Sequence, residues 1–189
     1  QAYSFLDEVL AVGLYGEAGR GLAWQAGLAD RFDFIQGTFA KAFGVIGGYL
    51  AGKIEALDAI RLQAKGFIFT TALPPAIAAA ALASLRLVKA KAELRHEFFA
   101  KVNSLRQKLL AANLPLLANQ SHIFPLIVGN ARACQNLASN LLREAGIYIQ
   151  AINYPTVAHG QERLRVTITP RHSQAMIDQL IAALVKYWP

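Results

Sequence analysis

Short apolar runs separated by glycine-rich breaks fill the first third of the chain. The runs lie at residues 3–7, 33–36 and 45–52, and each has the length of a buried strand. Residues 54–64 instead repeat their apolar positions at helical spacing. We therefore expect three strands followed by a helix.

The pattern becomes helical from Pro75 onward and stays so to residue 113. Proline is tolerated at the first helical position, where its missing N–H would have no helical partner. Two helices or one bent helix both fit this segment. We place a domain boundary inside it, which gives one domain at residues 1–90 and a second at residues 91–189.

The second half of the chain alternates between strand and helix periodicity. Gly146 suits a left-handed helix end, and Ser173 suits an N-cap. This alternation predicts a small α/β domain. The expected strands are 121–129, 147–152 and 163–170, and the expected helices are 130–146 and 173–188.

Composition indicates a well-buried globular chain, because 54% of the residues are hydrophobic and only 16% are charged. The net charge of +7 hints at an anionic ligand. The basic residues are scattered and do not alternate with aromatic residues, which argues against a nucleic-acid partner. The single cysteine, Cys134, excludes an internal disulfide, suits a reducing compartment and is expected to be buried in a helix.

The uncharged run at residues 66–85 has the length of a membrane span. Threonines and prolines interrupt it, and most of the remainder is alanine, which drives insertion weakly. We therefore interpret the run as a buried loop followed by a buried helix.

A lysine in a small-residue loop is the first candidate for chemistry. In GTFAKAFG, residues 37–44, Lys41 follows a predicted strand and has alanine on both sides. Desolvation in such a loop would favour the neutral, nucleophilic amine that Schiff-base formation with an aldehyde requires. The alternative is a lysine whose stem lies along the protein while its head reaches water.

The second candidate is an acid at the end of the first predicted strand. The stretch FLDEVLAVGLYGEAGRG, residues 5–21, delivers Asp7 and then breaks into a turn with four glycines. These glycines lack the spacing of the dinucleotide-binding fingerprint. The alternative for Asp7 is an acid at a strand end that caps the turn through local hydrogen bonds.

Four stretches together resemble the α-oxoamine synthase family of pyridoxal-phosphate enzymes, and within it the 5-aminolevulinate synthases. They are DEVLAVGLYG with Asp7, GTFAKAFG with Lys41, GFIFTTALPP at 66–75 and IYIQAINYPTV at 147–157. The resemblance spans the chain but matches only the C-terminal part of such an enzyme. It implies an α/β fold of the fold-type I PLP-dependent transferases, with part of the large cofactor-binding domain followed by the small C-terminal α/β domain.

The resemblance also implies roles for residues of the first domain. Lys41 would hold pyridoxal 5'-phosphate covalently and move protons at the substrate α-carbon, and Asp7 would keep the cofactor's ring nitrogen protonated. Thr38 would contact the phosphate within its own subunit. Thr70 and Thr71 would reach the phosphate of a neighbouring subunit, so a homodimer with the site at its interface is expected. Local backbone bonds are an equally good use of these two hydroxyls.

Two residues of the second domain would bind substrates. By resemblance, Arg165 would receive the carboxylate of the amino-acid substrate with its guanidinium fork. Arg163 points to the same face of the predicted strand, so only the resemblance selects Arg165. Thr156 in INYPTV would contact the succinyl carboxylate of the acyl-CoA, and this segment separates the 5-aminolevulinate synthases from related enzymes.

The implied reaction condenses glycine with succinyl-CoA and gives 5-aminolevulinate, CoA and carbon dioxide, the first step of tetrapyrrole synthesis. We expect it in the cytoplasm of a bacterium, or in the mitochondrial matrix of a eukaryote, with no metal, nucleic acid or membrane involved. One alternative is a sister acyltransferase, such as 8-amino-7-oxononanoate synthase or 2-amino-3-ketobutyrate CoA ligase. The other is a non-catalytic remnant or subunit.

A departure from the family pattern favours the remnant. Where the family has a histidine three residues after the aspartate, bonded to the cofactor's phenolic oxygen, this chain has Leu10, which can neither donate nor accept a hydrogen bond. The loop residues Ala158 and His159 also depart from the pattern. The presence of Asp7, Lys41 and Arg165 together favours the enzyme.

Overall fold

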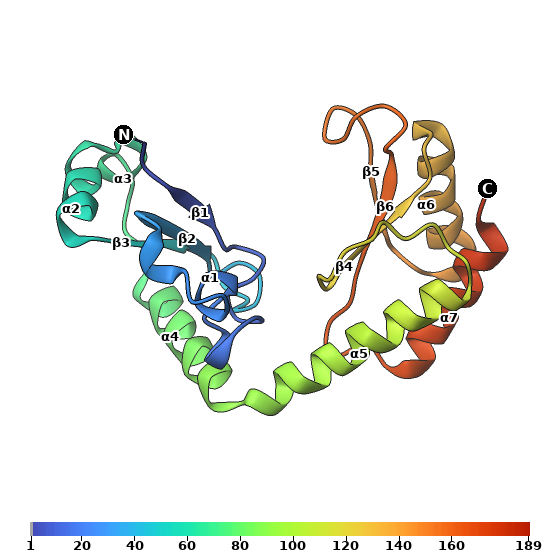
Figure 1. The fold of residues 1–189 in the computed structure, drawn as a ribbon, viewed down its shortest axis with the longest axis horizontal. Helices are drawn as coiled ribbons and strands as arrows, with labels where there is room; N and C mark the ends of the chain where they lie inside the picture. The colour runs from blue at the N-terminus through green and yellow to red at the C-terminus, as the bar shows by residue number, and fades with distance from the viewer. Residues whose placement is uncertain (1) are drawn as a thin grey trace. The chain divides into compact units, whose positions relative to one another are not determined.

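The strands form two separate three-stranded sheets, one in each of two compact units (Figure 1). The computed structural model describes residues 2–189. Unit 1 runs to Arg95, and unit 2 comprises His96–Pro189, so the units divide within helix α5 (Ala92–Ala111). The identification of residues 1–90 and 91–189 as a cofactor-binding domain and a small domain remains a prediction.

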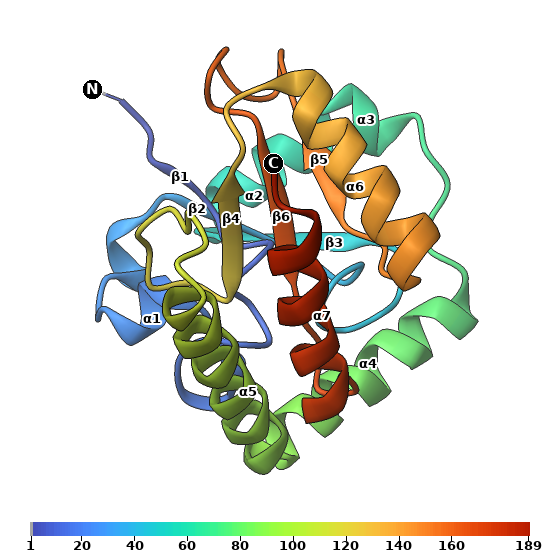
Figure 2. The same ribbon diagram turned by 90° about the vertical axis from the view of Figure 1, so that its right-hand side faces the viewer.

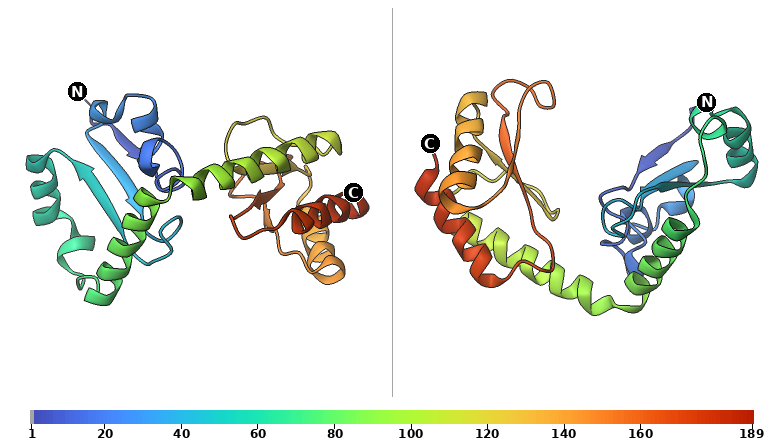
Figure 3. Two further views of the ribbon diagram at one scale, coloured as in Figure 1. Left: turned by 90° about the horizontal axis from the view of Figure 1, so that it is seen from below. Right: turned by 180° about the vertical axis from the view of Figure 1, so that it is seen from behind.

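Unit 1 is built on a sheet with the strand order β1-β2-β3 (Figure 3). Strands β1 (Phe5–Asp7) and β2 (Phe34–Thr38) are parallel, and Asp7 lies opposite Gln36. Strand β2 pairs antiparallel with β3 (Gly48–Gly52). Each strand overlaps one of the predicted apolar runs, so the three predicted strands are confirmed.

The helices of unit 1 differ in how well the sequence predicts them. The helix over residues 54–64 is confirmed, and Pro75 begins a helix as expected. Two four-residue helices were not predicted, because one turn is too short to show periodicity. The helices are α1 (Leu22–Gln25), α2 (Ile54–Gln63), α3 (Lys65–Ile68) and α4 (Pro75–Ala90).

The expectation of a buried loop and helix after residue 66 is wrong for this chain. Residues 66–74 are exposed, and Ala81 is the buried residue of α4. Helix α4 lies against the 3₁₀ turn Glu17–Gly19, which covers little of its length. The segment from Pro75 forms two helices, because Lys91 leaves the helical conformation between α4 and α5.

Unit 2 carries a fully antiparallel sheet with the order β4-β6-β5. On β6, the buried Leu164 and Val166 alternate with the exposed Arg165 and Thr167, so one face of the sheet is covered. Figure 2 shows α5, α6 and α7 on that face. The elements are β4 (Ile123–Ile127), α6 (Ala131–Ala145), β5 (Gln150–Ile152), β6 (Arg163–Thr167) and α7 (Gln174–Tyr187).

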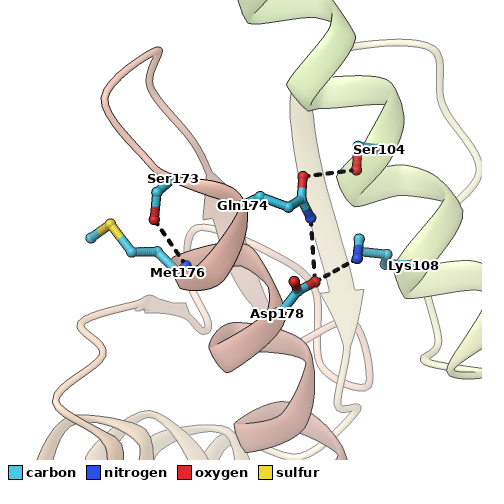
Figure 4. A network of polar contacts seen from close by, with 6 residues as sticks. All are labelled: Ser104, Lys108, Ser173, Gln174, Met176 and Asp178. Atoms are coloured by element: carbon cyan, nitrogen blue, oxygen red, sulfur yellow. Dashed lines mark hydrogen bonds and ion pairs between the residues drawn. The ribbon is translucent and has the colours of Figure 1, made fainter.

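The predicted helix ends in unit 2 are confirmed. Gly146 closes α6 in the left-handed conformation with φ 67°, which glycine adopts without a Cβ penalty. Ser173 caps α7, its Oγ accepting a hydrogen bond from the backbone N–H of Met176 at 3.2 Å. Figure 4 shows this cap beside the seam between α5 and α7, where Lys108 pairs with Asp178. The hydrogen bond from Lys108 lowers the pKa of the Asp178 carboxyl.

The core of unit 2 lies between its sheet and its three helices. The largest fully buried side chains of the described residues all belong to this unit, and Cys134 is among them, as predicted. Within residues 2–189, no helix is both long and apolar enough to cross a membrane. These core residues are Leu105, Leu109, Phe124, Leu126, Cys134, Leu137, Leu141, Leu164, Ile177 and Leu184.

Candidate active site

The candidate residues of unit 1 gather at one edge of its sheet. Because β1 and β2 are parallel, their carboxyl ends lie at the same edge, where ligands bind in open α/β sheets. Asp7 ends β1, and Thr38 ends β2. Lys41 follows in the loop of residues 39–47 that joins β2 to β3, as the sequence predicts.

Asp7 is held at the strand end by two hydrogen bonds. Its Oδ1 accepts from the backbone N–H of Val9 at 2.8 Å, and its Oδ2 accepts from Gln36 Nε2 at 3.4 Å. The bond to Val9 is the turn-capping contact expected of an acid at this position. An ionised carboxylate accepts about four hydrogen bonds, so this exposed side chain keeps acceptor capacity for a ligand.

Glu8, the neighbour of Asp7, was not singled out from the sequence. Its carboxylate is buried and accepts from the backbone N–H groups of Leu22 at 3.0 Å and Ala23 at 2.6 Å, the first two residues of α1. These bonds fold the glycine-rich turn back onto the end of β1. The signal was present in Gly21, because a glycine N-cap has no side chain to satisfy these amides.

The glycine-rich turn touches the lysine loop. A Cβ built on Gly13, which has φ +86°, would lie 2.5 Å from the Cβ of Ala42, so this contact requires glycine. Next to Ala42, the buried ring of Phe43 packs edge-on against Phe39 with centroids 5.8 Å apart. The packing of Phe43 against Phe39 therefore stabilises the loop that carries Lys41.

Lys41 itself is exposed. Its carbonyl accepts from the N–H of Gly44 at 3.1 Å, which tightens the loop, but Ala40 and Ala42 are too small to cover the amine. The desolvation that the motif predicts is therefore not supplied by unit 1 as it stands.

The predicted phosphate contacts divide into two kinds. The hydroxyl of Thr38 donates to the carbonyl of Gly47 at 3.1 Å and accepts from the N–H of Ala40 at 3.1 Å, so it already shapes the lysine loop. Thr70 and Thr71 are exposed in the connection from α3 to α4. In the same connection, a Leu73 methyl lies 2.9 Å from a Cβ built on Gly47, which brings this stretch against the lysine loop.

Tyr49 borders the same edge of the sheet. It lies opposite Gly37 across β2 and β3, and a Cβ on Gly37 would lie 2.3 Å from the tyrosine ring. Burial raises the pKa of the Tyr49 hydroxyl, and the negative charge of Glu8 raises it further. Leu10, in the turn after β1, is exposed and brings no polar group to this edge.

The two candidates of unit 2 lie on β6 and on the loop before it. Arg165 is exposed at the middle of β6, opposite Gln150 of β5 and Pro125 of β4. Arg163 already donates from Nε to the carbonyl of Gln161 at 2.7 Å. The described residues make no hydrogen bond or ion pair with the guanidinium of Arg165, which favours it as the arginine that can take a ligand.

The loop between β5 and β6 holds Thr156 at its exposed tip. The N–H of Thr156 donates to the carbonyl of Asn153 at 3.0 Å, which leaves the hydroxyl outside this turn contact. Beside Arg165, a cavity of about 500 Å³ extends over Tyr148, His172 and Met176. Cavities of this size accept small organic ligands.

Comparisons with known proteins identify close relatives of the chain. The family described as "Aminotransferase class I and II" matches residues 1–184. The 5-aminolevulinate synthase of Bradyrhizobium diazoefficiens is 48% identical over 187 residues, which cover 99% of this chain and 46% of that protein. The chain thus spans about half the length of the curated relatives it matches.

Solved structures give the same result for the fold. The structure of SPT with a PLP internal aldimine matches with a TM-score of 0.90 at 28% identity, covering 98% of this chain and 47% of that one. An 8-amino-7-oxononanoate synthase from Francisella tularensis matches with a TM-score of 0.82 at 25% identity, covering 96% and 53%. The predicted α/β fold of a fold-type I transferase, present in part, is confirmed, as is the resemblance to 5-aminolevulinate synthases.

Proposed function

Because the chain belongs to the aminotransferase class I and II family, we propose that it forms part of an enzyme that condenses glycine with succinyl-CoA and gives 5-aminolevulinate, CoA and carbon dioxide. The observation that carries this proposal is the 48% identity to a 5-aminolevulinate synthase along 99% of the chain. The segment INYPTV, which separates this activity from its sisters, supports the same choice.

The residues at the edge of the unit 1 sheet fit pyridoxal phosphate. Lys41 offers an exposed amine, and Asp7 at the end of β1 offers a carboxylate with spare acceptor capacity. The turn that follows Asp7 touches the lysine loop through Gly13 and Ala42. When bound, the cofactor supplies an electron sink for bond cleavage at the substrate's α-carbon.

In the proposed enzyme, the polar residues of unit 1 each bind or act on a different part of the cofactor or substrate. The carboxylate of Asp7 holds a proton on the cofactor's ring nitrogen, because a neighbouring negative charge favours the protonated form. The amine of Lys41 attaches the cofactor and then carries protons to and from the α-carbon. The hydroxyls of Thr38, Thr70 and Thr71 bind the phosphate, the last two in a neighbouring subunit.

Unit 2 supplies the contacts to the substrates. The guanidinium of Arg165 binds the carboxylate of glycine, a task for which its planar fork suits a two-point contact. The hydroxyl of Thr156 binds the carboxylate of the succinyl group. The described residues leave the guanidinium of Arg165 without a hydrogen bond or ion pair, which supports its part in this assignment.

The exposed apolar surface of unit 1 supports a larger assembly. Its large exposed side chains include Leu62, Phe67 and Phe69, and patches of this kind mark interaction surfaces. We place a second copy of the protein against this unit, in a homodimer that covers Lys41. The bacterial origin of the relatives supports a cytoplasmic enzyme.

A non-catalytic subunit or remnant is the second candidate function, and Leu10 favours it. Leucine leaves the cofactor's phenolic oxygen without the hydrogen bond that the family's histidine makes. The Leu10 side chain is exposed, so no repacked pocket takes the place of that bond.

The proposal is tested with the complete protein, supplied with pyridoxal phosphate, glycine and succinyl-CoA. We expect release of CoA and formation of 5-aminolevulinate, and loss of both in Lys41→Ala. Borohydride reduction followed by peptide mass spectrometry should find the cofactor on Lys41. The control is Lys89→Ala, an exposed lysine on α4 of the same unit, which should keep full activity.

Two results would contradict the proposal. CoA release with alanine and pimeloyl-CoA, but not with glycine and succinyl-CoA, would assign the chain to a sister enzyme. A protein that binds the cofactor without turning over either pair would be the remnant.

A further inference from the structure

The loop between β5 and β6 closes over a buried acid. Glu162 is only 3% exposed, and neither its Oε2 nor the buried Oδ1 of Asn153 has a hydrogen-bond partner among the described residues. The ladder of β5 and β6 ends at the pair Ile152 and Arg163, so Asn153 and Glu162 stand opposite each other one step beyond it. Residues opposite each other on antiparallel strands point to the same face.

Glu162 lies close enough to Cys134 of α6 for its charge to act on the thiol. Burial raises the pKa of this α6 thiol, a hydrogen bond to the backbone of Ile152 lowers it, and the charge of Glu162 raises it again. The thiol therefore lies near both the end of β5 and the carboxylate. Glu162 is an acid in the interior of unit 2, at the base of the loop.

A buried carboxylate is costly unless a positive or hydrogen-bonding group meets it. The interior provides no donor to Oε2, but His159 reaches the other oxygen from outside, with Nδ1 3.8 Å from Oε1. The imidazole also stacks on Tyr154, with ring centroids 4.4 Å apart and an interplanar angle of 11°. Tyr154, His159 and Glu162 thus connect the two arms of the loop.

Backbone bonds fix the ends of this connection. The carbonyl of Glu162 accepts from the N–H groups of Val128 and Gly129 at 2.8 and 3.0 Å, which ties it to the chain following β4. The N–H of Gln161 donates to the carbonyl of Ala158 at 3.0 Å. Thr156 lies between Tyr154 and His159 in the sequence, so the stacked pair sets the width of the loop that presents it.

We propose that Tyr154, His159 and Glu162 form a clamp that positions Thr156 for the carboxylate of the acyl substrate. This inference rests on the proposed function, in which Thr156 binds the succinyl group. The three are positioning residues, since they act on the substrate through the loop. His159 departs from the family pattern, so the clamp is a property of this chain.

Three variants of the complete, cofactor-loaded protein separate the parts of the clamp, and a fourth is the control. His159→Ala removes both contacts, His159→Phe keeps the stacking on Tyr154, and Glu162→Gln keeps the shape of the acid without its charge. The matched control is His96→Ala, which removes an exposed histidine at the start of unit 2.

We expect His159→Ala to raise the KM for succinyl-CoA by about threefold to tenfold, the scale of one partly exposed polar contact together with a ring contact. Glu162→Gln should give an increase in the same direction, and His159→Phe a smaller one than His159→Ala. The KM for glycine, the affinity for pyridoxal phosphate and kcat should stay within about twofold of the unmodified protein, as in the control. An equal rise in both KM values would overturn the proposal, because a general structural defect affects both substrates.

Amide hydrogen exchange tests the clamp without any turnover. In His159→Ala, the amides of Thr156 and Gln161 should exchange faster, whereas those in the middle of α6 should not change. Unchanged exchange at both loop amides would remove the clamp. If the unmodified protein makes no 5-aminolevulinate, the proposed function and the substrate role of Thr156 fail together, and the exchange rates alone then decide whether the clamp exists.

Discussion

Unit 2 closes a core of its own, whereas unit 1 does not. In unit 2, three helices cover one face of an antiparallel sheet, and side chains such as Phe124, Leu141 and Leu164 are 0% exposed. In unit 1, α2 and α3 bury no residue at all, and Phe69 is 81% exposed. Both units are rich in apolar residues. The difference is that the apolar faces of unit 2 pack against one another, whereas those of α2 and α3 in unit 1 are left incompletely covered.

This difference has a consequence for the candidate site. The turn after Asp7 and the loop that carries Lys41 are held by local contacts, such as the hydrogen bonds of Glu8 and the contact of Gly13 with Ala42. The loop that carries Thr156 stands on the packed base of unit 2. The loop of Lys41 in unit 1 therefore needs another surface to cover it before the candidate site is complete. The Thr156 loop of unit 2 already rests on a packed core.

The largest expected effect is on folding in isolation. A fragment of residues 91–189 should fold and melt cooperatively, with a free energy of unfolding of about 5 kcal/mol or more, typical of a domain with its own core. A fragment of residues 2–90 should show no cooperative transition. Circular dichroism during heating measures both, and a sharp transition in the second fragment would contradict the comparison.

Truncating one phenylalanine in each unit should sharpen the contrast. Phe124→Ala, in the core of unit 2, should lower the free energy of unfolding by about 3 to 5 kcal/mol. Phe69→Ala should change it by less than about 0.5 kcal/mol, since that ring is already in water. Urea denaturation of the 189-residue chain gives both values, and equal losses would mean that Phe69 is covered in solution.

The hydrogen bonds that Glu8 accepts should contribute measurably to the stability of unit 1. Glu8→Ala leaves the amides of Leu22 and Ala23 without acceptors, at a cost of about 1 to 3 kcal/mol. Hydrogen exchange at these two amides should accelerate accordingly. Glu17→Ala removes an exposed acid from the same turn and is the matched control. No acceleration in Glu8→Ala would show that the turn is held in another way.

The smallest expected effect is a pH dependence in unit 2. Burial lowers the pKa of His122 below 6.5, so the unfolded chain binds this proton more readily than the folded one. Stability should therefore fall as the pH drops below 6.5 and continue to fall toward the lowered pKa of the folded state. His122→Phe, which keeps an aromatic ring beside Phe98, should weaken this dependence, as measured by urea midpoints on both sides of that pH.

Most elements of the fold could be predicted because they depend on local chemistry. Gly146 and Ser173 end and begin helices through their own backbone and hydroxyl, and the apolar runs of unit 1 contain its strands. Burial could not be predicted in the same way. Helix α4 is as apolar as a core helix, yet only Ala81 finds a surface to cover it.

The candidate site shows the same division. The strand-end positions of Asp7 and Thr38 follow from strand patterns that the sequence displays. The cap on α1 joins Glu8 to residues 14 and 15 positions away, and the clamp joins Tyr154 to His159 and Glu162 through loop geometry. Such contacts depend on how turns bring side chains together, and no periodicity records them.

The reactivity of Cys134 reports on the opening of helix α6 in unit 2. It is the only thiol in the chain, it is 0% exposed, and burial raises its pKa, so a thiol-labelling reagent can reach a reactive thiolate only when α6 lifts from the sheet. The rate of labelling therefore measures how often that helix opens. Because the thiol bonds to the backbone at the end of β5 and feels the charge of Glu162, a bulky label there would also disturb the base of the Thr156 loop and keep α6 from closing again.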